Sequence, residues 1–554
     1  MKSKKVTISM QRNLILLCIV SLFWTACGKQ VPRHTSAIPN NATAVFAISP
    51  KEIFSKLNPS ELKELKFYDK MQEGMKDTDP ETEKFVEGIL KDPTSTGIDL
   101  FKDAFIFGYE YKEAIYWGTV LKMQSKSKFE KMLQKAPADV PKDVREGENC
   151  SRLELENDLY VCWDKNRLLF LATNRKGRKN LETVSNRLMN LEGDDQVSQQ
   201  ANFQDFATNS YDVGLWMNLE EVSREIKRSF PFLLSSSSLA ERIEMDDSFN
   251  HIFLSFAKGK TALKGQYYLT GESRKVYEKA FKGGLSRKVA NLIPNDIAGM
   301  YTAAFNPEVI KESIGEEAWE EFDDEAKAEV KMTGDEIMSI AGGEVAFIFH
   351  GVEQVEYTKT TRKFKSDPND PFNFDWETVE KTVNEPMPLF SGLFLIGNQK
   401  KAKELIEKVI EKEEEDMQIK DHGDYQSIQE SDVRVFFGTK NNVFVFGNNE
   451  AYIKDVMKGR VSGGSHPAVK KARSNPAVAY FGLHLDDIPE KIVREIKEDR
   501  KAYRSAKELS EFYKHLMFVG GKDGWELELA LADESTNSLN QFIRLSDEMN
   551  DIFD

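Results

Sequence analysis

Apolar residues along this chain cluster in short runs that alternate with polar, charge-rich segments. Residues 38–53 contain an Ile-Pro turn, a short apolar strand, the cap residue Ser49 and then a helix that begins at Pro50. Glu52 follows Ser49 by three residues, which completes a capping box, and proline is well tolerated at the first helical position. The same succession returns about 255 residues later, in residues 293–310. This pattern predicts a strand followed by a helix at both places.

Between these two segments the pattern predicts an antiparallel sheet. The apolar runs at residues 104–107 and 115–123 are typical of the two strands of a hairpin. An amphipathic helix is expected at 128–133, and further strands are expected at 152–163, 168–173, 213–218 and in a closing hairpin at 251–270.

The second half of the chain repeats this order of predicted elements. Residues 346–349 repeat the tetrapeptide of residues 104–107, and other matches follow in sequence, residues 405–406 with 132–133 and 515–517 with 251–253. We therefore expect two tandem homologous domains, residues 36–285 and residues 286–554. Each is predicted to be α+β, a mainly antiparallel sheet with helices packed on one face.

The spacing between corresponding positions locates an insertion in the second domain. This spacing is 242 residues at the repeated tetrapeptide and 273 residues at the following helix, so the second domain has gained 31 residues between them. The added length falls in a hairpin at about residues 351–388. Long segments that a scaffold does not need often carry function.

Three aromatic residues in this inserted hairpin are the candidate ligand-binding residues. Phe372, Phe374 and Trp376 alternate at the period of a strand, beside carboxylates. They can therefore present an aromatic edge to a sugar or to a protein. The alternative is that the three rings pack against their own domain. Calcium is not expected at the nearby Asp367, because the segment lacks the glycine and the distal glutamate of an EF-hand loop.

The N-terminus has the pattern of a lipoprotein signal peptide. A basic start precedes the apolar residues 14–24, a run of eleven that is too short to cross ~30 Å of hydrocarbon. Ala26 before Cys27 resembles a lipobox, so residues 1–26 are predicted to be removed, Cys27 to carry the lipid, and residues 27–35 to form a tether. An ordinary secretory signal is the alternative. The expected location is the outer membrane, on its periplasmic side, with the cell surface as the alternative.

Two cysteines, Cys150 and Cys162, remain in the predicted mature chain. Disulfides persist in the compartments of exported proteins, so the two are a candidate disulfide pair. A two-residue turn at Asn157 and Asp158 would place Cys162 opposite Leu153, with Cys150 further along the strand, and would favour two free thiols. Both interpretations stay open at this point.

Composition and motifs narrow the classes of function. The net charge of −15 disfavours nucleic-acid binding, and the mean hydropathy of −0.50 excludes a polytopic membrane protein. The histidines are scattered singly, and the motifs of zinc proteases, α/β-hydrolases and P-loop proteins are absent. His251 and His515 occupy corresponding places, which indicates a repeated structural role. We predict no cofactor, no metal and no catalytic residue.

The segment after the lipobox carries a resemblance to a known family. The run Ile-Pro-Asn-Asn-Ala-Thr-Ala-Val and the capped helix at Ser49 and Pro50 resemble the start of an uncharacterised family of Bacteroidetes lipoproteins, classed as a domain of unknown function. The resemblance extends over the mature length and both repeats. It implies an envelope location and transfers no catalytic residue to this chain.

Together these patterns predict a lipid-anchored envelope protein that is not an enzyme. It is expected to contact the membrane through its N-terminal lipid and to bind a glycan or an envelope protein, through the inserted hairpin or a cleft between the domains. The alternative is an envelope hydrolase acting on polysaccharide or peptidoglycan, whose carboxylates converge only in the folded chain. Two close carboxylates with a raised pKa in one pocket would favour that alternative.

Overall fold

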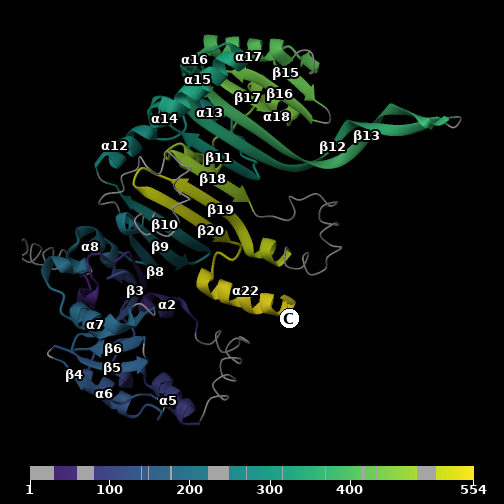
Figure 1. Ribbon diagram of the computed structural model, residues 1–554. Helices are drawn as coiled ribbons and strands as arrows, with labels where there is room; N and C mark the ends of the chain where they lie inside the picture. The colour runs from purple at the N-terminus through teal and green to yellow at the C-terminus, as the bar shows by residue number, and fades with distance from the viewer. Residues whose placement is uncertain are drawn as a thin grey trace, which may run out of the picture. The chain divides into compact units, whose positions relative to one another are not determined.

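The computed structural model in Figure 1 describes most of the chain. It covers residues 30–58, 80–222, 249–413, 418–482 and 507–553, apart from 139, 148, 157, 175–176, 270, 315, 368–369 and 431–432. The chain is α+β, with antiparallel sheet and packed helices, which confirms the predicted fold class. Cys27 and the predicted signal peptide lie outside the described residues.

The chain forms two compact units, and the boundary between them falls inside strand β9 (Phe249–Ala257), after Leu254. The sequence places this boundary at residue 285 instead. The difference arises because β10 (Lys260–Tyr268) pairs with β20 (Gly524–Leu531) and so belongs to the second unit.

The first unit contains an antiparallel sheet with the strand order β9, β8, β1, β2, β3, β7, β6, β5, β4. Its other strands are β1 (Ala44–Ile48), β2 (Ala104–Tyr111), β3 (Ala114–Lys122), β4 (Arg145–Glu146), β5 (Ser151–Glu156), β6 (Leu159–Trp163), β7 (Arg167–Thr173) and β8 (Val213–Asn218). Its helices are η1 (Arg33–Ala37), α2 (Pro50–Lys56), α5 (Pro80–Lys91), η2 (Pro93–Thr96), α6 (Lys126–Gln134), η3 (Arg178–Asn180), α7 (Leu181–Met189), η4 (Gly193–Asp195), η5 (Val197–Gln199) and α8 (Ala201–Thr208).

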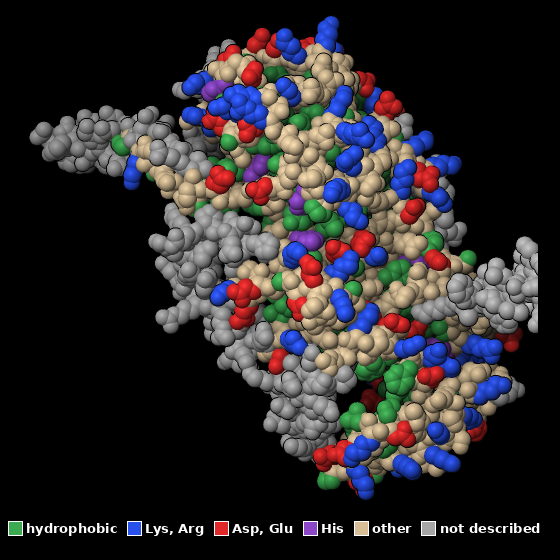
Figure 2. All heavy atoms as spheres, turned by 180° about the vertical axis from the view of Figure 1, so that it is seen from behind, with side chains coloured by type: hydrophobic (Ala, Val, Ile, Leu, Met, Phe, Trp, Pro, Cys, Tyr) green, Lys and Arg blue, Asp and Glu red, His purple; other side chains and the backbone are tan. Residues whose placement is uncertain are grey.

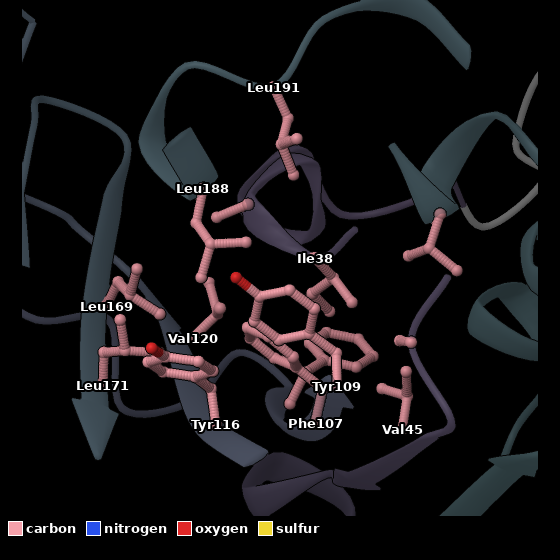
Figure 3. Close-up of a cluster of buried hydrophobic side chains, with 14 of the residues drawn as sticks. Ile38, Val45, Phe107, Tyr109, Tyr116, Val120, Leu169, Leu171, Leu188 and Leu191 are labelled. Carbon is pink, nitrogen blue, oxygen red and sulfur yellow. The ribbon is translucent and has the colours of Figure 1, made fainter. Parts of the chain in front are cut away.

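One face of this sheet carries the core of the first unit. Every second residue of β1 and β2 is buried there, including Val45 and Phe107, and residues of α7 and α8 complete the cluster. Figure 3 shows the ring of Tyr109 among Ile38, Phe107 and Val120. Each large apolar side chain buried in this way stabilises the fold by roughly 1.5–3 kcal/mol. The Ile-Pro turn therefore anchors the chain, because Ile38 is fully buried.

The fold begins earlier than the sequence predicts. Residues 33–35, expected to belong to the tether, lie in η1, where His34 and Thr35 are buried. The ring nitrogen Nε2 of His34 lies 2.7 Å from the carbonyl oxygen of Asp103, and the Thr35 hydroxyl donates to Pro32. These polar side chains are buried with partners, which composition alone does not reveal.

The second unit contains an antiparallel sheet with the order β10, β20, β19, β18, β11, β12, β13, β17, β16, β15, β14. From β18 onwards this order matches that of the first unit from β8 onwards, strand for strand. Its other strands are β11 (Gly299–Ala304), β12 (Ala341–Asp367), β13 (Asp370–Ile396), β14 (Gln418–Asp421), β15 (Gln426–Glu430), β16 (Val433–Lys440), β17 (Val443–Gly447), β18 (Ala477–Gly482) and β19 (Tyr513–Gly520).

Helices α13, α18 and α19 supply side chains to the core on one face of this sheet, where Met300, Ile348 and Leu393 are buried. The helices of the unit are α12 (Gly271–Ala280), α13 (Arg287–Ala290), α14 (Pro307–Ile314), α15 (Glu316–Val330), α16 (Gly334–Ile340), α17 (Gln399–Glu413), α18 (Glu450–Met457), α19 (Pro467–Ala472) and α22 (Ser538–Phe553).

The repeated tetrapeptide Ala-Phe-Ile-Phe does not play the same role in the two units. In β2 both phenylalanines, Phe105 and Phe107, are buried in the core. In β12 the core positions are Ala346 and Ile348, and Phe347 is 43 % exposed. The pairing register explains this, since Val45 of β1 pairs with Phe107 whereas Met300 of β11 pairs with Ile348. The sequence match is therefore one residue out of phase, which exchanges the two faces of the strand.

Candidate functional site: the β12–β13 arm and the aromatic face at its base

Strands β12 and β13 form a hairpin that is much longer than the sheet that holds it. At the base, β12 pairs with β11 over Glu344–Phe349 and β13 pairs with β17 over Ser391–Leu395. From Gly351 and Leu389 outwards, the two strands pair only with each other within the described part of the chain. We call this distal part, residues 351–367 and 370–389, the arm. Figure 1 shows it projecting from the sheet of the second unit.

A β-bulge marks the point where the arm leaves the sheet. Phe349 pairs with Phe390 and Gly351 with Leu389, so His350 is an extra residue in β12. Gly351 has a φ of 112°, which favours glycine. The His350 ring lies 4.7 Å from the ring of Tyr452 in α18, and its Nε2 is 2.9 Å from the hydroxyl of Ser391. Burial lowers the pKa of His350 to about 4. The base of the arm is thus fixed on the core side of the sheet.

The three predicted aromatic residues all lie near the tip of the arm, in β13. Trp376 pairs with Phe364 and Phe374 pairs with Ser366. The register then shifts, so that the next pair is Asp370 with Asp367, and Phe372 falls in the irregular stretch. Regular alternation, predicted for all three residues, therefore holds only for Phe374 and Trp376.

The sheet face opposite the core carries aromatic residues at the base of the arm, and the sequence reasoning missed them. Tyr301 and Phe481 are each 48 % exposed, Phe390 is 44 % exposed, and Phe347 is 43 % exposed. The ring of Phe394 lies 5.6 Å from that of Phe347. The register places them on one face, since Tyr301 pairs with Phe347 and Phe481 pairs with Gly299. We call these five residues the open aromatic face.

The open aromatic face and the predicted residues of the arm belong to one alternating set. Strand β13 runs from Phe394 to Phe374 without an extra residue, because the bulge lies in β12. Phe390, Phe394, Phe374 and Trp376 therefore occupy positions of the same parity in this strand. The sequence carries Phe347, Phe390 and Phe394 in apolar runs, where an exposed phenylalanine cannot be told from a buried one.

Hydrogen bonds and neighbouring lysines set the shifts of the carboxylate pKa values in the described part of the chain. Each carboxylate with a clearly shifted pKa is shifted downwards, as in Glu404, where hydrogen bonds from Lys408 and Lys401 lower the pKa to about 2. Among the same residues, no three His, Cys, Asp or Glu side chains are arranged to hold a metal ion. On the face drawn in Figure 2, acidic and basic side chains are interspersed.

Cys150 and Cys162 are buried and free in the structure. A bulge between Glu154 and Glu156 sets Cys162 opposite Arg152, so the predicted pairing with Leu153 is wrong by one residue. Interaction with the neighbouring thiol of Cys162 lowers the pKa of Cys150 below its ordinary value. Their disulfide stays a prediction.

The two histidines expected to correspond lie in different surroundings. His251 pairs with Trp216, and its ring packs against Phe206 in the core, where burial lowers its pKa to about 3. His515 pairs with Gly482, is partly exposed, and lies 3.7 Å from a carboxylate oxygen of Glu528. A shared structural role for these two residues is therefore wrong.

Comparison with known proteins finds one family model that matches part of the chain. A domain of unknown function, DUF4836, spans residues 34–296, which is just under half of the chain and ends before β11. No curated protein matches the chain. Crystal forms IV and III of TP0453 have a TM-score of 0.25 with it, at 10 % identity. They cover 44 % and 43 % of this chain and 82 % and 80 % of their own. No helix in the described ranges is long and apolar enough to span a bilayer.

Proposed function

We propose that this chain is a lipid-anchored protein of the cell envelope, without enzymatic activity, that binds a protein partner through the arm and the open aromatic face. The observation that carries the proposal is the lateral isolation of the arm, whose strands pair only with each other from Gly351 to Leu389 among the described residues. The lipid anchor at Cys27 and the periplasmic side of the outer membrane rest on the signal-peptide pattern of the sequence.

An isolated two-stranded hairpin is marginally stable in water. Within the described parts of the chain, each strand of the arm also leaves one row of backbone N–H and C=O groups without a neighbouring strand. Such rows are templates for an added strand, and natural proteins usually cover or shorten them. A bound protein that adds a strand would satisfy these groups, and this argues for a protein partner.

The open aromatic face is a second, independent observation that supports a protein partner. Contiguous exposed apolar surface on a folded protein commonly marks an interaction site. Aromatic side chains are also enriched among the residues that dominate the binding energy of interfaces. Because the face and the residues near the tip share one parity along β13, a partner can follow the strand from the sheet onto the arm.

The test compares three variants of the full chain for binding to proteins of the envelope fraction, with a photo-crosslinking residue at Thr382. The first variant replaces residues 352–388 by Asn-Gly and loses the crosslinking position, so its binding is measured by affinity capture. The second is Phe374→Ser with Trp376→Ser, which retains the arm. The control is Trp117→Ser, which removes an aromatic side chain that is 59 % exposed in the first unit.

We expect the first variant to lose the partner, the second to weaken binding at least tenfold, and the control to bind as the parent does. Equal capture by all three variants would contradict the proposal. A purified envelope glycan that binds the parent, and fails to bind the second variant, would replace the protein partner by a glycan.

A further inference from the structure

A groove of about 760 Å³ lies between helices α5 and α6 of the first unit. One face of α5 lines it, with residues at the spacing of successive helical turns, and α6 contributes a facing stripe. The α5 residues are Glu81, Lys84, Phe85, Gly88, Ile89 and Asp92, and those on and after α6 include Lys128, Lys131, Met132 and Lys135. Two amphipathic faces therefore meet across an open space instead of packing together.

The walls of this groove are apolar in the middle. Phe85, Ile89 and Met132 are half-buried and line the space between the helices. Gly88 lies between Phe85 and Ile89 on the same helix face, and a Cβ atom added there would meet no atom within 4 Å. The volume is within the ~300–1,000 Å³ typical of small-molecule sites.

The rim of the groove is basic, in a chain whose net charge is −15. Five lysines line it against two carboxylates. Lys84, Lys131, Lys135 and Lys142 form no ion pair with a described carboxylate, and Lys128 donates to the carbonyl of Thr94 at 3.5 Å. One of the two carboxylates, Asp92, is engaged in capping η2, where it accepts a bond from the backbone N–H of Thr94 at 3.1 Å. Clustered lysines around a concave, low-dielectric surface raise the local concentration of anions.

We infer that the α5–α6 groove binds a long-chain fatty carboxylate, with the acyl chain along Phe85, Gly88, Ile89 and Met132 and the carboxylate among the rim lysines. The apolar walls argue against a simple inorganic anion as the ligand, and the rim lysines without an ion pair to a described carboxylate argue against a neutral hydrocarbon. The concave shape fits a single molecule, whereas the surface of a bilayer requires a flat or convex contact. This site is independent of the arm and of the proposed function.

The experiment measures binding of hexadecanoate to the full chain by calorimetry, with every variant prepared in the same way. Gly88→Leu fills the groove from within a helix, where leucine has a higher helix propensity than glycine, so this variant should fold at least as well as the parent. Lys131→Glu with Lys135→Glu reverses the charge of the rim. The control Lys102→Glu changes an exposed lysine of the same unit that lies outside the groove.

We expect Gly88→Leu to abolish hexadecanoate binding, the double charge reversal to weaken it at least tenfold, and Lys102→Glu to leave it unchanged. Hexadecanol and inorganic phosphate, each carrying only half of the ligand's chemistry, should bind at least tenfold more weakly than hexadecanoate. Binding that survives Gly88→Leu would overturn the inference. So would equal binding of hexadecanol or phosphate, or binding only to vesicles of an anionic phospholipid.

Discussion

Two hairpins hold the same place in the strand order of their units, and they end differently. The β2–β3 hairpin turns at Lys112 and Glu113, and its strands are paired laterally with β1 and β7 over most of their length. Among the residues that the structure describes, the β12–β13 hairpin is paired laterally at its base, and through the arm its two strands pair only with each other. Pairing with neighbouring strands therefore stabilises the whole β2–β3 hairpin, whereas it stabilises only the base of the β12–β13 hairpin within the described residues.

The arm must therefore draw its stability from its own cross-strand pairs or from a partner. The register sets Lys363 opposite Glu377 and Lys365 opposite Asp375. Opposite charges at facing positions of an antiparallel pair contribute roughly 0.2–1 kcal/mol each. Such contributions are small beside the burial that holds the β2–β3 hairpin, and four substitution experiments sharpen this contrast.

The largest difference is expected at the repeated tetrapeptide. Phe105→Ala removes a fully buried ring and should lower the free energy of unfolding of the first unit by about 3–5 kcal/mol. Phe347→Ala removes a ring of the open aromatic face and should cost less than about 1 kcal/mol. Hydrogen exchange of the two units, followed separately, measures both. Equal costs would contradict the assignment of opposite faces.

The next effect is a pH dependence at the base of the arm. The pKa of His350 is lowered from 6.5 to about 4 by burial, so between these values the unfolded state binds the proton more readily. Stability of the second unit should therefore fall as the pH decreases from 6.5 to 4, by up to about 3 kcal/mol from this residue. Urea unfolding across this pH range measures it, and His350→Gln should flatten the profile. A profile unchanged by that substitution would exclude His350 as the cause.

A smaller difference is expected between two glycines at which a ring crosses the neighbouring strand. A Cβ atom at Gly118 of β3 would lie 2.2 Å from the buried ring of Phe107, and one at Gly392 of β13 would lie 2.0 Å from the ring of Phe446. Gly118→Ala should lower the free energy of unfolding by about 1–3 kcal/mol, because the packed core leaves the Phe107 ring no room to move. Gly392→Ala should cost less, since Phe446 is partly exposed and can turn towards solvent. Thermal unfolding compares the two, and a larger loss for Gly392→Ala would be contrary to expectation.

The smallest effect is expected at the turn of the short hairpin. Lys112 and Glu113 both have positive φ, 49° and 61°, which is the geometry of a type I′ turn. Replacing them by Asn-Gly should raise the stability of the first unit by about 1 kcal/mol, because these residues adopt that geometry with less strain. Hydrogen exchange should slow in β2 and β3 and remain unchanged in the arm. Slower exchange in the arm as well would show that the two hairpins are coupled.

The sequence predicts the fold class because this depends on local patterns. Alternation marked the strands, and the change in spacing between corresponding segments marked residues 351–388. It could not predict register, because register depends on which neighbour each strand finds. The out-of-phase tetrapeptide and the bulge at His350 are both register effects. The unit boundary was missed for a similar reason, since β10 pairs with a strand more than 250 residues away.

The candidate site was predicted in part. Phe374 and Trp376 were identified from their alternation, but the open aromatic face was not, because an exposed phenylalanine and a buried one look alike in an apolar strand. The α5–α6 groove was missed for another reason. In the sequence, its lysines have the pattern of an ordinary solvent-exposed helix surface. Only the fold shows that two such surfaces line one space.

Because the arm is long, a small rotation at its base moves its tip by a large distance. Seventeen residues of extended strand span about 55 Å at ~3.3 Å per residue, so a rotation of roughly 10° at the bulge would displace the tip by about 10 Å. The extra residue at His350 and the positive φ of Gly351 are therefore placed where a small local adjustment is magnified most. Binding near Trp376 that rotates the arm would therefore change the packing of the His350 ring against Tyr452.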